Sequence, residues 1–273
     1  MTDTLAEPAP PAGASGAPTL EARGISKSFG SVQALTEVDF DVRVGEVMAL
    51  VGDNGAGKST LIKCMAGIYS IDEGEMYFDG EPVSISGPKD AARLGIEVVY
   101  QDLALCDNLD VVQNMYLGRE EHGFLWRLSE ATMESHTAET LKSLAVTTIR
   151  SIRQQVATLS GGQRQSVAVA RAVMWNSRVV ILDEPTAALG VAQTRQVLDL
   201  VRRLAEQGLA VVFISHNLHD IFEAADRITV LRLGRNVAVH NRATTTQQEV
   251  VHDITAGAPT KVAGIADTGD ATT

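Results

Sequence analysis

The stretch from residue 52 to residue 60 has the residue types and the spacing that a bound phosphate chain requires. It reads Gly-Asp-Asn-Gly-Ala-Gly-Lys-Ser-Thr. Glycines let the backbone turn tightly and approach the phosphates, so that successive N–H groups point at the oxygens. Lys58 would add a positive charge for the outer phosphates, and the Ser59 hydroxyl could ligate Mg²⁺. The residues expected to hold phosphates are Gly52, Asn54, Gly55, Gly57, Lys58, Ser59 and Thr60.

The segments on either side of this loop have the pattern that such a site needs. Residues 46–51 form a short apolar run typical of a buried strand, and residues 61–66 have an apolar face at helical spacing. The helix would begin near Gly57 and turn its positive end toward the anion. A glycine-rich turn without a ligand is the alternative, but it does not explain the order strand, loop, helix. The sequence therefore predicts a site for a nucleoside triphosphate.

A second apolar run, residues 178–182, delivers two acidic residues, Asp183 and Glu184. Carboxylates at the end of a buried strand are costly unless they have partners. Asp183 is predicted to hold Mg²⁺, directly or through water. Glu184 is predicted to orient or deprotonate the water that attacks the γ-phosphate. An acidic turn without chemistry is the structural alternative.

A third motif, Leu159-Ser160-Gly161-Gly162-Gln163, precedes a predicted helix. Taken alone, Ser160 would be an N-cap and the glycines a turn. A serine and two glycines at a helix start can also bind an anion. Since the first loop already serves one nucleotide, this site would serve the γ-phosphate held by another copy of the chain.

Composition limits the remaining possibilities. The chain has 273 residues, of which 45% are hydrophobic, enough for one large domain or a core with a subdomain. The net charge of −11 argues against a duplex partner, so no nucleic acid is expected. Residues 1–18 and 257–273 are rich in small and polar types and are predicted to be disordered tails around a domain at 19–256. No apolar stretch approaches the roughly 20 residues of a membrane helix.

The order of apolar runs predicts an α/β domain with a mostly parallel sheet covered on both faces. Residues 26–30 are expected to lie between strands, and residues 102–158 lack strand signals, which indicates a helical subdomain inserted at about 102–175. Strands are expected at 19–24, 38–44, 46–51, 76–78, 95–100, 178–182, 210–214 and 228–233, and helices at 129–144, 161–175 and 191–206.

With these motifs in this order, residues 19–240 resemble the nucleotide-binding subunit of an ATP-binding-cassette (ABC) transporter. The third motif matches that family's signature, and Asp183-Glu184 matches its second acidic motif. Gln101, His216 and Phe29 match the glutamine loop, the switch histidine and the aromatic residue that stacks on adenine. Taken singly, these three would be an ordinary polar residue at a strand end, a structural histidine and a half-buried loop aromatic.

The resemblance implies a P-loop NTPase (RecA-like) core with an N-terminal antiparallel β subdomain and an inserted helical subdomain. It implies ATP and Mg²⁺ as ligands. Catalysis would fall to Glu184, His216 and Gln101, with Ser59, Gln101 and Asp183 at the metal. Further nucleotide contacts would come from Phe29, Ser160, Gly161, Gly162 and Gln163.

Several stretches resemble the subunits that energise monosaccharide uptake, in a short form with a single cassette as in ribose, fructose or xylose-type systems. This implies a head-to-tail dimer of two copies, integral membrane permease subunits, a separate sugar-binding protein and a position at the cytoplasmic face of the cell membrane. The stretches are residues 51–55, 99–102, 114–120, 187–190 and 215–217.

One position departs from the family pattern. Gly190 stands where the family commonly has an aspartate that supports communication between the two ATP sites. A glycine there would let the backbone approach the partner copy closely. Two other functions remain open: a soluble cassette ATPase acting on ribosomes or DNA, and a regulatory module that binds nucleotide with little turnover.

Overall fold

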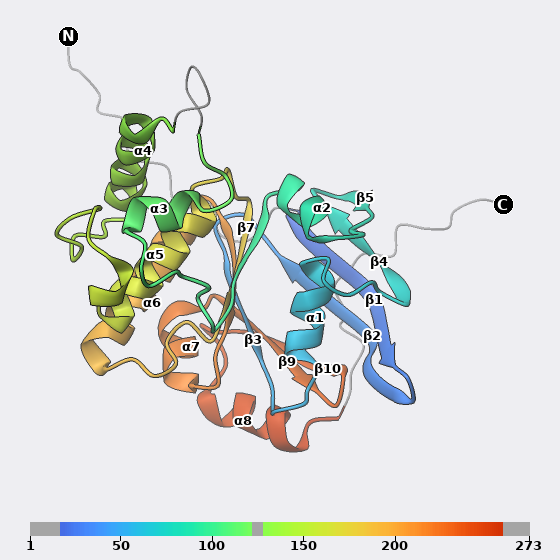
Figure 1. Cartoon of the computed structure of the whole chain (residues 1–273). Helices are drawn as coiled ribbons and strands as arrows, with labels where there is room; N and C mark the ends of the chain where they lie inside the picture. The colour runs from blue at the N-terminus through green and yellow to red at the C-terminus, as the bar shows by residue number, and fades with distance from the viewer. Residues whose placement is uncertain (1–16, 122–127, 259–273) are drawn as a thin grey trace, which may run out of the picture.

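The computed structural model describes residues 17–121 and 128–258 (Figure 1). The predicted tails at 1–18 and 257–273 lie almost wholly outside the described residues and stay predictions. Among the described residues, no helix is both long and apolar enough to cross a membrane.

The larger of two sheets has six strands in the order β10-β9-β3-β8-β7-β6. Five of them run parallel, and β10 pairs antiparallel with β9 at one edge. The central strands are continuous apolar runs because both faces of the sheet are covered. The strands are β3 (Val47–Val51), β6 (Ile96–Val99), β7 (Val179–Asp183), β8 (Ala210–Ile214), β9 (Arg227–Arg232) and β10 (Arg235–Asn241).

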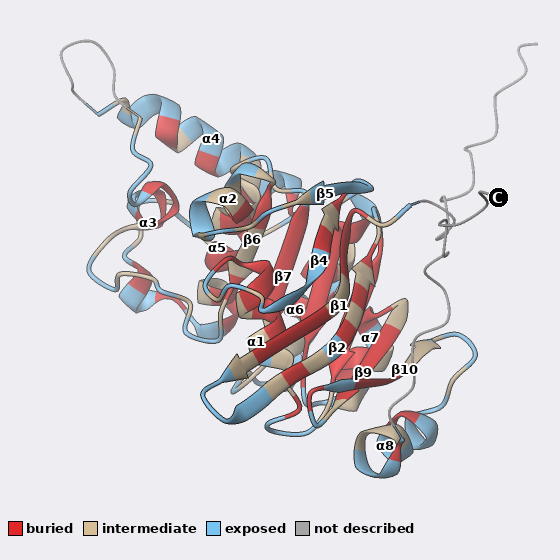
Figure 2. Cartoon of the chain, turned by 90° about the vertical axis from the view of Figure 1, so that its right-hand side faces the viewer, coloured by how far each residue is buried: buried red, intermediate tan, exposed pale blue. Residues whose placement is uncertain are grey.

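Alternation along these strands divides the core into two halves. Val47, Ala49 and Val51 of β3 pack with residues of helices α3, α5, α6 and α7. Met48 and Leu50 face the other way, toward α1 and the second sheet. Buried residues, red in Figure 2, follow the strands of both sheets. The helices are α1 (Lys58–Met65), α2 (Pro88–Arg93), α3 (Val111–Tyr116), α4 (Glu130–Ser143), α5 (Gly161–Val173), α6 (Val191–Glu206), α7 (Leu218–Ala224) and α8 (Gln247–Ala256).

The second sheet is antiparallel, with the order β2-β1-β4-β5. The prediction that residues 26–30 lie between strands is wrong, because β1 continues through residues 26–29 instead of ending at Gly24. Gly24 has φ 59° and lies at a register shift between Ala22 and Ile25, so it forms a bulge rather than a strand end. The strands are β1 (Leu20–Phe29), β2 (Val32–Val42), β4 (Glu73–Phe78) and β5 (Glu81–Val83).

Helices α3, α4 and α5 lie together at one end of the molecule (Figure 1). Arg153 joins the elements there: its guanidinium donates to Asp110 at the N-cap of α3 (3.1 Å) and to Glu130 (2.8 Å) and Glu134 (2.6 Å) on α4. These contacts hold α4 against the start of α3. The limits of the subdomain predicted at 102–175 stay a prediction.

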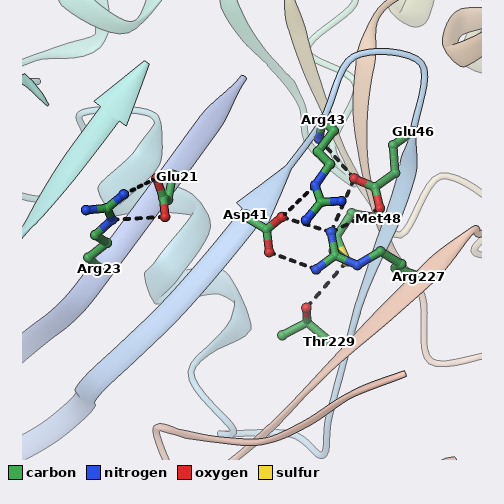
Figure 3. Close-up of polar contacts among 8 residues, drawn as sticks. All are labelled: Glu21, Arg23, Asp41, Arg43, Glu46, Met48, Arg227 and Thr229. Atoms are coloured by element: carbon green, nitrogen blue, oxygen red, sulfur yellow. Dashed lines mark hydrogen bonds and ion pairs between the residues drawn. The ribbon is translucent and has the colours of Figure 1, made fainter. Parts of the chain in front are cut away.

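A cluster of buried and half-buried charges ties the two sheets together (Figure 3). Arg227 at the start of β9 makes two hydrogen bonds to Asp41 on β2, at 2.8 and 2.9 Å. It also pairs with Glu46, just before β3, at 3.2 Å. The Glu46 side chain is only 3% exposed, and burial raises its pKa although the Arg227 charge opposes that rise. Arg43 completes the cluster, because its Nε lies 3.5 Å from Asp41 and its backbone N–H donates to Glu46 at 2.9 Å.

Arg227→Met should therefore lower the free energy of unfolding strongly, by about 3 kcal/mol, because it removes the cation that pairs with the buried carboxylate of Glu46 and leaves Asp41 only the longer contact with Arg43. Urea unfolding followed by circular dichroism would measure this. Arg93→Met is the matched control, since Arg93 pairs with Asp90 on the surface and its side chain is 77% exposed. Equal effects of the two substitutions would show that the Arg227 cluster does not hold the sheets together.

Candidate functional site

A cavity of about 460 Å³ gathers most of the predicted site residues. Val32, Gln33, Ala34, Ala56 and Ile214 complete its wall. The predicted residues that line it are Asn54, Gly55, Gly57, Lys58, Ser59, Thr60, Gln101, Asp183 and Glu184.

The parallel sheet explains why residues so distant in sequence meet. Leu50 of β3 and Asp183 of β7 both pair with Ile214, the last residue of β8. The carboxyl ends of these strands therefore reach one edge of the sheet, where the connecting loops meet. Gln101 follows β6 at the same edge.

Close backbone contacts shape the phosphate-binding loop. Gly57, the N-cap of α1, has φ 103°, and a Cβ there would lie 2.7 Å from Leu35 and 2.9 Å from the carbonyl oxygen of Ala34. A Cβ on Gly52 would lie 2.2 Å from the carbonyl oxygen of Leu231. Both positions thus require glycine. No side chain caps α1 in the described structure, so its first N–H groups can serve an anion.

Lys58 turns back onto the loop that carries it. Its Nζ donates to the carbonyl oxygens of Gly52, at 2.6 Å, and of Asp53, at 3.0 Å. Burial lowers the pKa of Lys58, while the negative charges of Glu184, Asp53 and Asp183 work in the opposite direction. The Lys58 side chain is thus half-buried, lies among acidic groups and lines the cavity.

Asp183 and Glu184 enter the cavity from the end of β7. Ile181 of β7 faces α1, and by alternation Asp183 points to the same side, toward the phosphate-binding loop. Burial, together with the charge of Glu184, raises the pKa of Asp183. Glu184 has φ 52°, a left-handed backbone that is costly for a residue other than glycine, and its N–H donates to Ile214 O at 3.0 Å.

The donor set in this cavity fits Mg²⁺. Ser59, Gln101 and Asp183, the three predicted metal residues, all line the cavity and present oxygen atoms. Mg²⁺ in such sites is held by one or two carboxylates together with substrate phosphates. Asp183 supplies such a carboxylate beside the phosphate-binding loop.

His216 lies in direct contact with Glu184. Its Nδ1 is 2.7 Å from Glu184 Oε2, and its backbone N–H donates weakly to the same oxygen at 3.4 Å. The His216 side chain is 75% exposed, whereas that of Glu184 is 17% exposed. The pair therefore presents an exposed imidazole beside a more protected carboxylate at the cavity.

The third motif and Phe29 are not part of the wall of this cavity. Ser160 forms a reciprocal capping box with Gln163, whose amide nitrogen also donates to Thr148 O at 2.6 Å. Gly161 and Gly162 lie against Leu189 and Gln193, close to the start of α6. Within one copy, the predicted second anion site thus lies outside the cavity that holds the phosphate-binding loop.

Sequence reasoning missed the contribution of Val32, Gln33 and Ala34. They lie at the start of β2, where the backbone of Ala34 comes close to Gly57 of the phosphate-binding loop, and this contact between distant parts of the sequence brings them to the cavity. Gly190 is the N-cap of α6, with φ −74°, and a Cβ there would meet nothing within 4 Å. The fold of a single copy therefore does not require glycine at this position.

Known proteins match this chain along most of its length. Residues 35–187 match the family model described as ABC transporter. The fructose import ATP-binding protein of Rhizobium meliloti is 48% identical, over 86% of this chain and 92% of the relative. The xylose/arabinose import ATP-binding protein of Sulfolobus acidocaldarius is 44% identical, over 89% of this chain and 96% of the relative. A ribose import ATP-binding protein of Yersinia pestis is 43% identical, over 86% of this chain and 46% of the relative.

Solved structures agree with the sequence matches. A nucleotide-free ATP-binding cassette from an ABC transporter superposes with a TM-score of 0.77 at 25% identity, covering 87% of this chain and 98% of that one. A dimeric ATP-binding cassette in a post-hydrolysis state, bound to ADP and Pi, superposes with a TM-score of 0.69 at 25% identity, covering 82% and 98%.

Lys58→Ala should weaken the binding of Mg-ATP by roughly 100-fold, because it removes the cation that faces the phosphates. Isothermal titration calorimetry with a non-hydrolysable ATP analogue measures this. Lys89→Ala removes an exposed lysine from α2 and is the matched control. Unchanged affinity in Lys58→Ala would refute the role assigned to Lys58.

Proposed function

This chain belongs to the ABC transporter family, and on that premise we propose that it binds and hydrolyses ATP to energise a membrane permease for monosaccharide uptake. The observation that carries the proposal is the single cavity shared by Lys58, Ser59, Gln101, Asp183 and Glu184. Relatives at 43–48% identity are named as import ATP-binding proteins for fructose, xylose/arabinose and ribose, which supports a monosaccharide as the transported substrate.

Family membership confirms three predictions made from the sequence. These are the resemblance to ABC transporter subunits, the P-loop NTPase fold and the ATPase class.

The phosphate chain of ATP would lie along residues 52–60, with N–H groups at the start of α1 facing its oxygens. Lys58 would exchange the carbonyls of Gly52 and Asp53 for phosphate oxygens. Ser59, Asp183 and Gln101 would hold Mg²⁺, which would neutralise negative charge on the phosphates when bound.

Glu184 would orient and deprotonate the attacking water. Its carboxylate lies at the cavity and accepts from His216, a contact that fixes the direction of the carboxylate. The exposed imidazole of His216 could reach the γ-phosphate once a ligand competes for its hydrogen bonds. Because both residues are in place, the geometry favours turnover over a purely regulatory role.

The nucleotide pocket would be completed by a second copy of the chain. Ser160, Gly161, Gly162 and Gln163 begin α5 outside the cavity of their own copy. In a head-to-tail pair they would face the γ-phosphate bound by the partner. A cassette similar to this chain forms a dimer with ADP and Pi, which supports the arrangement. ATP would then close the pair, because it gains these contacts only in the closed state.

Glu184→Gln tests the base and the pair together. The substitution preserves size and removes the proton acceptor, so ATP binding should persist while phosphate release falls by roughly 100-fold or more. The variant should also elute as a dimer in size-exclusion chromatography when ATP is present.

Glu223→Gln on α7 provides the control, because Glu223 pairs with His219 rather than with His216. It should leave both measurements near wild type. Undiminished phosphate release from Glu184→Gln would exclude Glu184 as the base.

The partners of the pair would be integral membrane permease subunits and a separate sugar-binding protein, at the cytoplasmic face of the cell membrane. Co-purification of the full chain from membranes, with identification of the bound proteins, should recover a permease and a periplasmic or surface sugar-binding protein. Recovery of ribosomal proteins or DNA instead would favour the soluble-ATPase alternative. The same preparation from a strain lacking that permease serves as the control.

A further inference from the structure

The Phe29 ring stands beside the wall of the nucleotide cavity. Phe29 ends β1 and is the cross-strand partner of Val32, one of the residues of β2 that line the cavity. The preceding residue, Ser28, donates its hydroxyl to Gln33 Oε1 at 2.7 Å. Phe29 is 42% exposed, so part of the ring is open to a ligand.

Tyr69 contacts the Phe29 ring edge to face. The ring centroids are 5.0 Å apart and the planes are inclined by 71°. Tyr69 lies in the loop after α1, which ends at Met65, and its N–H donates to the carbonyl of Lys63 at 3.1 Å. The Lys63 ammonium lies 5.4 Å from the Tyr69 ring centroid. The Phe29 ring is thereby linked to the helix that begins at the phosphate-binding loop.

Asp72 fixes the backbone that leads into Phe29. Its Oδ2 accepts from the N–H of Ser28 at 2.7 Å, and its Oδ1 pairs with Lys27 Nζ at 2.6 Å. Its own N–H donates to Ser26 O at 3.0 Å. The Lys27 side chain is only 11% exposed, and its Nζ lies 5.6 Å from the Phe29 ring centroid. Asp72 thus restrains the last residues of β1 before Phe29.

An aromatic ring that is already held loses little freedom when a base stacks on it. We propose that Tyr69 and Asp72 are positioning residues for the nucleobase, holding Phe29 in the orientation that stacks on adenine. This inference rests on the proposed ATP function. Because Tyr69 acts through Phe29, it matters for ligands that carry a base and not for the phosphate chain alone.

The test compares the dissociation constants of two magnesium complexes, those of ATP and of inorganic triphosphate, by calorimetry. Tyr69→Ala should raise the constant for ATP by roughly 2- to 10-fold, the contribution of an aromatic pair. The constant for triphosphate should stay the same. Tyr69→Phe keeps the ring edge and should restore wild-type affinity. Ile68→Ala, at the exposed neighbouring position, is the matched control.

Asp72→Asn retains an acceptor for Ser28 but loses the charge opposite Lys27. It too should raise the dissociation constant for ATP and leave that for triphosphate the same. In a Phe29→Ala background, Tyr69→Ala should have no further effect, because the pair is then already broken. An effect of Tyr69→Ala on both ligands, or one that persists without Phe29, would overturn the proposal.

Two further outcomes separate this inference from the proposed function. If Phe29→Ala leaves the ratio of ATP to triphosphate affinity unchanged, the stacking role is wrong and the positioning role falls with it. If wild-type protein binds neither ligand, the proposed function itself fails.

Discussion

The alignment of parallel strands is the constraint on which the site depends. Leu50 and Asp183 both pair with Ile214, so the phosphate-binding loop after β3 and the two acidic residues ending β7 emerge at the same level. A shift of one residue in the pairing of β7 with β8 would turn Asp183 from the α1 side to the opposite face of the sheet. The continuous apolar strands that fix this register are therefore as necessary for the chemistry as the acidic residues themselves.

The second sheet contributes the other side of the site, and polar contacts keep it there. Gly234 donates to Ala56 O at 3.0 Å and accepts from Thr36 N at 2.7 Å, joining the β9–β10 turn, the phosphate-binding loop and β2. The Arg227 cluster adds a second link between the sheets. A nucleotide whose phosphates lie on one sheet and whose base lies on the other would thus bind across a junction that is already fixed.

The sequence predicted those parts that depend on local pattern. The bounds of α6 and β8 agree with the structure because each is a long amphipathic or continuous apolar run. β1 was predicted too short because a glycine such as Gly24 is typical of the end of a strand, whereas here it forms a bulge within the strand. The phosphate-binding loop and the acidic residues stood out as motifs, and the cavity brings them together. Gln33 and Tyr69 did not stand out in the sequence. Each contacts residues that lie tens of positions away along the chain, and a local sequence pattern does not predict such contacts.

The position of the Lys58 ammonium also bears on which anions the loop can admit. Two of the three N–H groups of Lys58 Nζ are bound to the carbonyls of Gly52 and Asp53, so an anion that does not displace these acceptors finds one N–H group at Lys58. Chloride offers a single point of contact and gains little by replacing a carbonyl. A triphosphate offers several oxygens at once, to Lys58 and to the N–H groups of α1, and can compensate for the carbonyl bonds that it replaces. The backbone of the loop thereby limits what a small anion can gain at Lys58.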